Sequence, residues 1–253
     1  MLKTRVIPTL LWKDYGLVKG KAFDSWRRIG SLLPAIRVYN TRDVDELIVV
    51  DITASREGHE IDFETVEEFA ADCFVPLTVG GGLRHIDQVT KLLRSGADKV
   101  CLNSVCYESP QFVEESAKRF GSQCVVVSID AKKTEQGYVC YSHSGSQIQN
   151  QSPVLWAKEM QERGAGEILL TSIDRDGLME GFDLELIQEV CDAVSVPVIA
   201  SGGAGNYDDF YKAVQAKASA VAGASLFHFT EQTPRQAKEY LSKKGVAVRQ
   251  GAQ

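Results

Sequence analysis

Two glycine-rich segments, each following a short apolar run, could bind phosphate. Gly81 and Gly82 follow VPLTVG, and Gly202 and Gly203 follow VPVIAS. Backbone N–H groups next to glycine are not shielded by a Cβ atom, and a helix that starts nearby adds positive dipole character. A single pair of glycines after a strand is more often only a tight turn. Each segment therefore needs independent support before it indicates anion binding.

An internal repeat provides that support. Pro76 aligns with Pro197 (197 − 76 = 121), and Glu46 aligns with Glu167 at the same offset (167 − 46 = 121). A chain made of two similar halves should bind similar groups in both halves, so we predict two phosphate sites and a substrate with two similar ends. The predicted phosphate-binding residues are Gly81, Gly82, Asn103 and Ser104 in the first half and Gly202, Gly203, Ala224 and Ser225 in the second.

The elements that position these residues are short β-branched runs separated by segments with helical periodicity. Runs that are apolar on both faces and joined by helices predict a parallel sheet, which eight such units can close into a barrel. We expect an α/β fold, a (β/α)8 TIM barrel built from two (βα)4 half-barrels, with residues 1–253 as one domain. A doubly wound open sheet is the alternative. The expected strands are 4–10, 46–52, 75–81, 98–104, 124–130, 167–173, 196–202 and 219–225.

Composition excludes several classes of protein. The net charge of −6 gives nucleic acid no broad attraction. No stretch approaches the roughly 18 to 20 apolar residues of a membrane span, so we expect a cytoplasmic protein without a membrane partner. The six cysteines form no CxxC pair, which favours free thiols over disulfides or metal ligands. We expect no metal and no cofactor.

Several long segments together resemble one enzyme family. They are VDELIVVDITAS, PLTVGGGLR, GADKVCLNS, GSQCVVVSIDAK, GAGEILLTSIDRDG, PVIASGGAG and ASLFHF, and the similarity spans residues 1–248. The chain is similar to the cyclase subunit of imidazole glycerol phosphate synthase. That resemblance implies a subunit that takes ammonia from a separate glutaminase and cleaves and cyclises a bisphosphorylated ribulosylamino-imidazole carboxamide nucleotide. The products would be imidazole glycerol phosphate and aminoimidazole carboxamide ribonucleotide.

The resemblance also implies roles for individual residues. Two aspartates on symmetry-related strands would do the acid–base chemistry: Asp130 matches one, but Leu11 stands where the other is expected. A leucine cannot carry a proton, and Asp14, three positions on, should face the other side of an extended strand. Further implied substrate contacts are Lys19 and Phe23 in a mobile first loop, Asp51, Ser144, Thr171 and Ser201. Asp176 and Gly177 either contact the ligand or only form a turn, and His143 is a weaker candidate.

Charged residues at strand starts suggest a second feature. Arg5, Glu46, Lys99 and Glu167 each begin a predicted strand, and from charge alone they could be ordinary rim pairs. The resemblance implies instead a salt-bridged ring around an ammonia entrance, with Asp98 at the face where the glutaminase docks. The glutaminase would be another chain, because this one has no recognisable Cys-His-Glu machinery.

Three functions stay open on the sequence alone. The first is the family reaction with Asp130. The second is a divergent paralogue that relays ammonia from its own glutaminase to aminate or amidinate a surface-polysaccharide sugar, which Leu11 favours. The third is a non-catalytic scaffold that activates a glutaminase.

Overall fold

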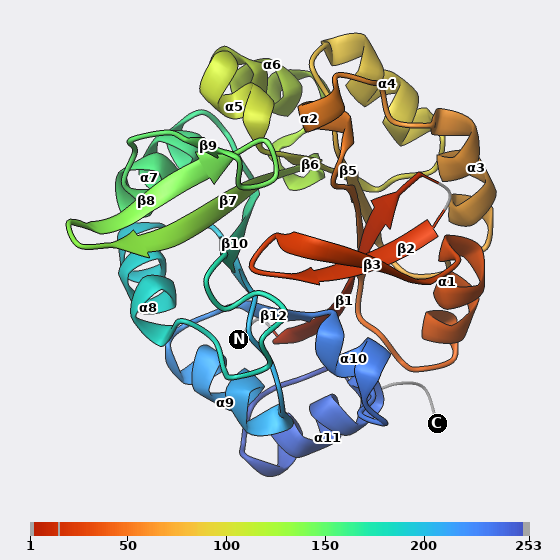
Figure 1. Cartoon of the computed structure of the whole chain (residues 1–253), viewed down its shortest axis with the longest axis vertical. Helices are drawn as coiled ribbons and strands as arrows, with labels where there is room; N and C mark the ends of the chain where they lie inside the picture. Colours follow the sequence, from red (N-terminus) through yellow and green to blue (C-terminus); the bar gives the residue numbers. More distant parts are fainter. Residues whose placement is uncertain (1–2, 15, 250–253) are drawn as a thin grey trace.

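A computed structural model describes residues 3–14 and 16–249 and shows a closed barrel (Figure 1). Eight parallel strands follow the order β10-β11-β12-β1-β4-β5-β6-β7, and the pairing of β10 with β7 closes the ring. The expected (β/α)8 barrel is confirmed, and the open sheet is excluded. The barrel strands are β1 (Arg5–Lys13), β4 (Leu47–Asp51), β5 (Leu77–Gly80), β6 (Lys99–Leu102), β7 (Val125–Thr134), β10 (Glu167–Ser172), β11 (Val198–Ser201) and β12 (Ala220–Gly223).

Both faces of the barrel wall are apolar, as a sheet covered by helices requires. Inside the barrel, one buried cluster contains Ile7, Ile48, Cys101, Val126, Leu169, Ile199, Ala220 and Ala222. A larger cluster, which includes Val6, Leu47 and Val100, packs against the surrounding helices. Because side chains alternate along a strand, Val6 and Ile7 serve the outer and the inner cluster respectively.

Helices connect the strands and surround the barrel (Figure 1). Several begin at side chains that cap free backbone N–H groups: Asp62 accepts from the N–H groups of Glu64 and Thr65, and Asn206 forms a capping box with Asp209. The helices are α1 (Leu32–Asn40), α2 (Ala54–Glu57), α3 (Phe63–Ala71), α4 (Ile86–Arg94), α5 (Ser104–Glu108), α6 (Gln111–Phe120), the 3-10 turn η1 (Ser122–Cys124), α7 (Pro153–Glu162), α8 (Leu184–Ala193), α9 (Tyr207–Gln215), α10 (Ser225–Phe229) and α11 (Pro234–Lys243).

Lys19 and Phe23, which were expected in a loop, lie in a hairpin instead. The chain after β1 forms an antiparallel hairpin of β2 (Gly16–Lys21) and β3 (Asp24–Gly30), with Lys19 in β2 and Phe23 at the turn. β7 extends in the same way into β8 (Gly137–Ser142) and the short β9 (Gln147–Ile148). The first strand of each half-barrel therefore continues into a hairpin, which agrees with the internal repeat.

Candidate active site

A single cavity at the carboxyl ends of the barrel strands brings the predicted ligand-binding residues together. It occupies about 1160 Å³, including its open mouth. Parallel barrels place their catalytic groups at this end, because the loops that follow the strands converge there. Its lining includes Lys19, Asp51, Gly81, Gly82, Asn103, Ser104, Asp130, Ser144, Thr171, Asp176, Gly177, Ser201, Gly202, Gly203, Ala224 and Ser225.

Asp130 is one of three buried carboxyl groups that line this cavity, with Asp51 and Asp176. It is 8% exposed, and its oxygens accept hydrogen bonds from Asn103 Nδ2 at 3.1 Å and from Ser128 Oγ at 3.3 Å. Burial raises the pKa of Asp130 to about 7; the Ser128 hydrogen bond opposes this rise and the nearby Asp176 charge adds to it. A group with this pKa is populated in both protonation states near neutral pH, as a proton carrier requires.

Leu11 occupies the position in the first half that Asp130 occupies in the second. Leu11 pairs with Val50 across β1 and β4, and Asp130 pairs with Thr171 across β7 and β10. Val50 and Thr171 are related by the repeat offset (171 − 50 = 121), so the strand register makes the two positions equivalent. Asp14, three positions after Leu11, is exposed in the turn after β1 and is not part of the cavity lining.

The two glycine segments have the backbone conformation that only glycine adopts without strain. Gly81 has φ of 119° and Gly202 has φ of 84°. A Cβ atom at Gly81 would lie 2.4 Å from the carbonyl oxygen of Asp51, and one at Gly202 would lie 2.6 Å from that of Ser172. These tight turns bring backbone to the cavity wall, as close approach to a ligand demands.

The second part of each predicted phosphate site also repeats. Asn103 precedes α5 with φ of −132° and ψ of −82°, and Ala224 precedes α10 with φ of −121° and ψ of −71°. The two halves differ in their hydroxyl groups: Ser104 Oγ accepts from the backbone N–H of His143, whereas Ser225 Oγ is buried without a hydrogen-bond partner. A buried hydroxyl without a partner suits a site that a ligand completes.

Lys19 and Asp176 form a buried ion pair in the wall of the cavity. Lys19 Nζ lies 2.8 Å from both carboxylate oxygens of Asp176, and the lysine side chain is only 2% exposed. The backbone of the hairpin is held at the same place, since the N–H of Ala22 donates to the carbonyl of Asp176 at 2.8 Å. The hairpin is therefore docked onto the loop that follows β10.

Other predicted contact residues hold the loops around the cavity. Asp51 Oδ1 accepts from the backbone N–H groups of Thr53 and Ala54 at 2.8 and 3.0 Å, which fixes the turn into α2. Ser144 Oγ donates to the carbonyl of Ile52 and so ties the β8–β9 turn to the end of β4. Thr171 and Ser201 line the cavity directly. His143 is not part of the lining; its Nε2 lies 3.3 Å from Glu108.

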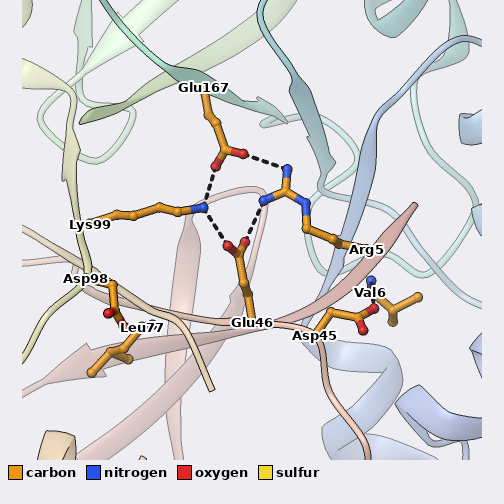
Figure 2. Close-up of polar contacts among 8 residues, drawn as sticks. All are labelled: Arg5, Val6, Asp45, Glu46, Leu77, Asp98, Lys99 and Glu167. Atoms are coloured by element: carbon orange, nitrogen blue, oxygen red, sulfur yellow. Dashed lines mark hydrogen bonds and ion pairs between the residues drawn. The ribbon is translucent and has the colours of Figure 1, made fainter. Parts of the chain in front are cut away.

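The four charged strand-start residues form a closed ring at the opposite end of the barrel (Figure 2). Arg5 lies 2.8 Å from Glu46 and 2.7 Å from Glu167, and Lys99 lies 2.5 and 2.9 Å from the same two carboxylates. Burial alone would lower the pKa of Arg5, but the two carboxylates outweigh it and raise the pKa. Asp98, beside the ring, accepts from the backbone N–H of Leu77 at 2.8 Å.

Comparison with known proteins agrees with this geometry. A family described as "Histidine biosynthesis protein" matches residues 5–233, which include every residue assigned above to the cavity and the ring. The chain belongs to this histidine biosynthesis family. A Campylobacter jejuni relative with the provisional name imidazole glycerol phosphate synthase subunit hisF2 is 44% identical over 98% of this chain and 99% of its own length. The imidazole glycerol phosphate synthase subunit HisF of Natranaerobius thermophilus is 45% identical over 98% of this chain and 100% of its own length.

In this member of the histidine biosynthesis family, the cavity also contains residues that the sequence did not single out. Ser128, Trp26 and Met179 line it. Ser128 could have been found from its place two residues before Asp130 on the same face of a strand. Trp26 could not, because only the fold of the hairpin brings it to the cavity. Within the described ranges, no group of three His, Cys, Asp or Glu residues could hold a metal ion, and none of the helices is long and apolar enough to cross a membrane.

Proposed function

We propose that this chain is the cyclase subunit of an imidazole glycerol phosphate synthase. It would use ammonia from a partner glutaminase to convert the bisphosphorylated ribulosylamino-imidazole carboxamide nucleotide to imidazole glycerol phosphate and aminoimidazole carboxamide ribonucleotide. The observation that carries the proposal is a buried carboxyl, Asp130, that shares one cavity with two repeated glycine turns. Full-length similarity to the two relatives supports the same reaction.

The two ends of the substrate would be held by the two half-barrels. Gly81, Gly82, Asn103 and Ser104 would bind one phosphate, and Gly202, Gly203, Ala224 and Ser225 the other, with Gly177 nearby. Backbone N–H groups and hydroxyls suit phosphate oxygens because they donate hydrogen bonds without a competing negative charge. Lys19, Asp51, Ser144, Thr171, Ser201 and Asp176 would contact the substrate between them.

Asp130 would act as the proton carrier. In its ionised form it can take a proton from the attacking nitrogen, and in its protonated form it can return one to the leaving group. Asn103 and Ser128 keep the carboxyl oriented in both states, since each donates to one oxygen. Leu11, on the opposite strand, contributes no proton, so the proposed chemistry runs with one acid–base residue where the resemblance implies two.

Ammonia would enter through the ring of Arg5, Glu46, Lys99 and Glu167. The ring is electrically balanced, with two cations and two anions in contact. Between it and the cavity lies the apolar cluster of Ile7, Ile48 and Val126 with their neighbours. Moving a charge through such a layer is costly, whereas a neutral molecule crosses it readily. The barrel interior would therefore pass ammonia and exclude ammonium.

The partner glutaminase would dock at the face that surrounds this ring. Asp98 lies there, and the backbone N–H of Leu77 fixes one of its carboxylate oxygens. Docking over the ring would deliver ammonia to the entrance without release to solvent.

The proposal is tested by turnover of the bisphosphate substrate by the purified chain, once with ammonium salt and once with glutamine plus the cognate glutaminase. We expect imidazole glycerol phosphate in both assays. Absence of product in both, with a folded protein, would contradict the proposal.

One observation favours a second candidate. Leu11 removes one proton carrier while the ring stays complete, as expected of a paralogue that relays ammonia to another acceptor, such as a surface-polysaccharide sugar. Glutamine hydrolysis stimulated by this chain, without conversion of the bisphosphate, would favour that function over cyclisation.

A further inference from the structure

The hairpin brings two aromatic rings into the cavity. Phe23 and Trp26 both line it, together with Leu11 and Met179. Their ring centroids are 6.5 Å apart and their planes are tilted by 37°, so neither ring stacks on the other. The cavity wall thus combines phosphate-binding turns with an aromatic surface, a combination that suits a ligand with both a phosphate and a planar unsaturated ring.

Two glycines from separate elements make room for these rings. A Cβ atom at Gly20 would lie 2.9 Å from Cε3 of Trp26, and one at Gly145 would lie 3.0 Å from Cδ2 of Phe23. Each ring therefore packs closely over glycine backbone. Gly20 in turn lies against Gly177, where a Cβ atom would meet the Gly20 carbonyl oxygen at 2.2 Å. Close packing from Trp26 through Gly20 to Gly177 fixes the indole relative to the β10 side of the cavity.

Backbone strain in the hairpin turn indicates that tertiary contacts hold the two rings in this arrangement. Ala22, Phe23 and Ser25 have φ of 47°, 61° and 55°, which side chains with a Cβ atom rarely adopt. Such conformations persist where surrounding contacts over-determine them, and they cluster at ligand-binding sites. Here the contacts are the Lys19–Asp176 ion pair and the Ala22–Asp176 hydrogen bond.

We infer that Trp26, with Phe23, forms a subsite that packs against the planar heterocycle of a phosphorylated ligand. The inference rests on the proposed function and names a specificity-determining residue for it.

The three tryptophans make the test direct. Trp12 and Trp156 are 2% and 3% exposed, and only Trp26 lines the cavity. The ligands are aminoimidazole carboxamide ribonucleotide, which has the heterocycle, and ribulose 1,5-bisphosphate, which has two phosphates and no aromatic ring. Calorimetry measures their affinities for wild type, Trp26→Ala, Trp26→Leu and Trp26→Phe, and circular dichroism checks folding.

We expect the nucleotide to change the fluorescence of the wild type, and Trp26→Phe to lose that change while keeping affinity within about threefold. Trp26→Ala and Trp26→Leu should bind the nucleotide about tenfold more weakly, as stacking energies imply, and the bisphosphate unchanged. Equal losses for both ligands, or no loss for the nucleotide, would overturn the inference and leave the proposed function standing. Failure of folded wild type to bind either ligand would count against the proposed function itself.

Discussion

Leu11 and Asp130 line the same cavity from opposite sides of the barrel. Three strands separate β1 from β7 in either direction around the ring, and the register places the two residues at equivalent positions of the two halves. At these two equivalent positions, one half of the barrel therefore carries a titratable group and the other an aliphatic one. This asymmetry distinguishes the two halves, although their glycine turns are alike.

Asp130 should determine how activity depends on pH. Because its pKa is raised to about 7, we expect kcat/KM with ammonia, corrected for the fraction present as NH3, to rise with pH and level off above about 7. Asp130→Asn should lower kcat by about 10²- to 10⁴-fold and remove the inflection. A profile of unchanged shape in the variant would assign the inflection to another group.

The same carboxyl should make the protein less stable at high pH. The pKa of Asp130 is higher in the folded protein than the usual 3.8, so the folded state keeps a proton that the unfolded chain releases between about pH 4 and pH 7. Its contribution to stability is therefore lost as the pH rises through that window. Asp130→Asn should become more stable than wild type by an amount that grows to a few kcal/mol at pH 8, on the order set by the pKa difference. Urea unfolding at pH 5 and pH 8 measures this, and a constant difference would refute it.

The ion pair of Lys19 and Asp176 should hold the β2–β3 hairpin closed. Asp176→Asn leaves the lysine ammonium buried without an anionic partner, which favours undocking of the hairpin. We expect trypsin to cleave after Lys21, Arg27 or Arg28 at least tenfold faster, as followed by mass spectrometry. Asp14→Asn, an exposed change at the other end of the hairpin, is the matched control and should leave the cleavage rate unchanged.

The charged ring should couple glutamine hydrolysis by the partner glutaminase to product formation in the barrel. Lys99→Met leaves Glu46 and Glu167 with only Arg5 between them. We expect the product formed per glutamine hydrolysed to fall at least fivefold, because a distorted entrance releases ammonia to solvent. Lys118→Met removes a lysine of the same length from an exposed helical pair and should keep the ratio of the wild type. If both variants form the same amount of product per glutamine hydrolysed, the ring has no role in ammonia transfer.

The barrel could be predicted from sequence because its signals are local and repeated. All eight expected strands form, and the offset of 121 between Pro76 and Pro197 indicated the symmetry of the two halves. Most cavity residues could be predicted as well, because they come directly after strands whose carboxyl ends meet at one end of the barrel. The family resemblance implied the asymmetry of Leu11 and Asp130, although the strand register was needed to show that the positions are equivalent.

The hairpins could not be predicted in the same way. Residues 16–30 lack a clean alternation of apolar and polar side chains, and β3 is mostly exposed. The place of the β2–β3 hairpin depends on contacts between residues that are distant in sequence, such as those of Lys19 with Asp176 and of Gly20 with Gly177. Trp26 was missed for this reason, because its path into the cavity follows from the docking of the hairpin.

The most direct test of the central claim is ammonia-dependent formation of imidazole glycerol phosphate by wild type and by Leu11→Asp. Apart from His143, the other predicted substrate-contacting residues all line the cavity. We therefore predict slow turnover by wild type and at least tenfold faster turnover by Leu11→Asp, with Leu11→Asn as the polar control that cannot carry a proton and stays slow. No product from wild type or from the folded Leu11→Asp variant would contradict the assignment of this cavity to cyclisation.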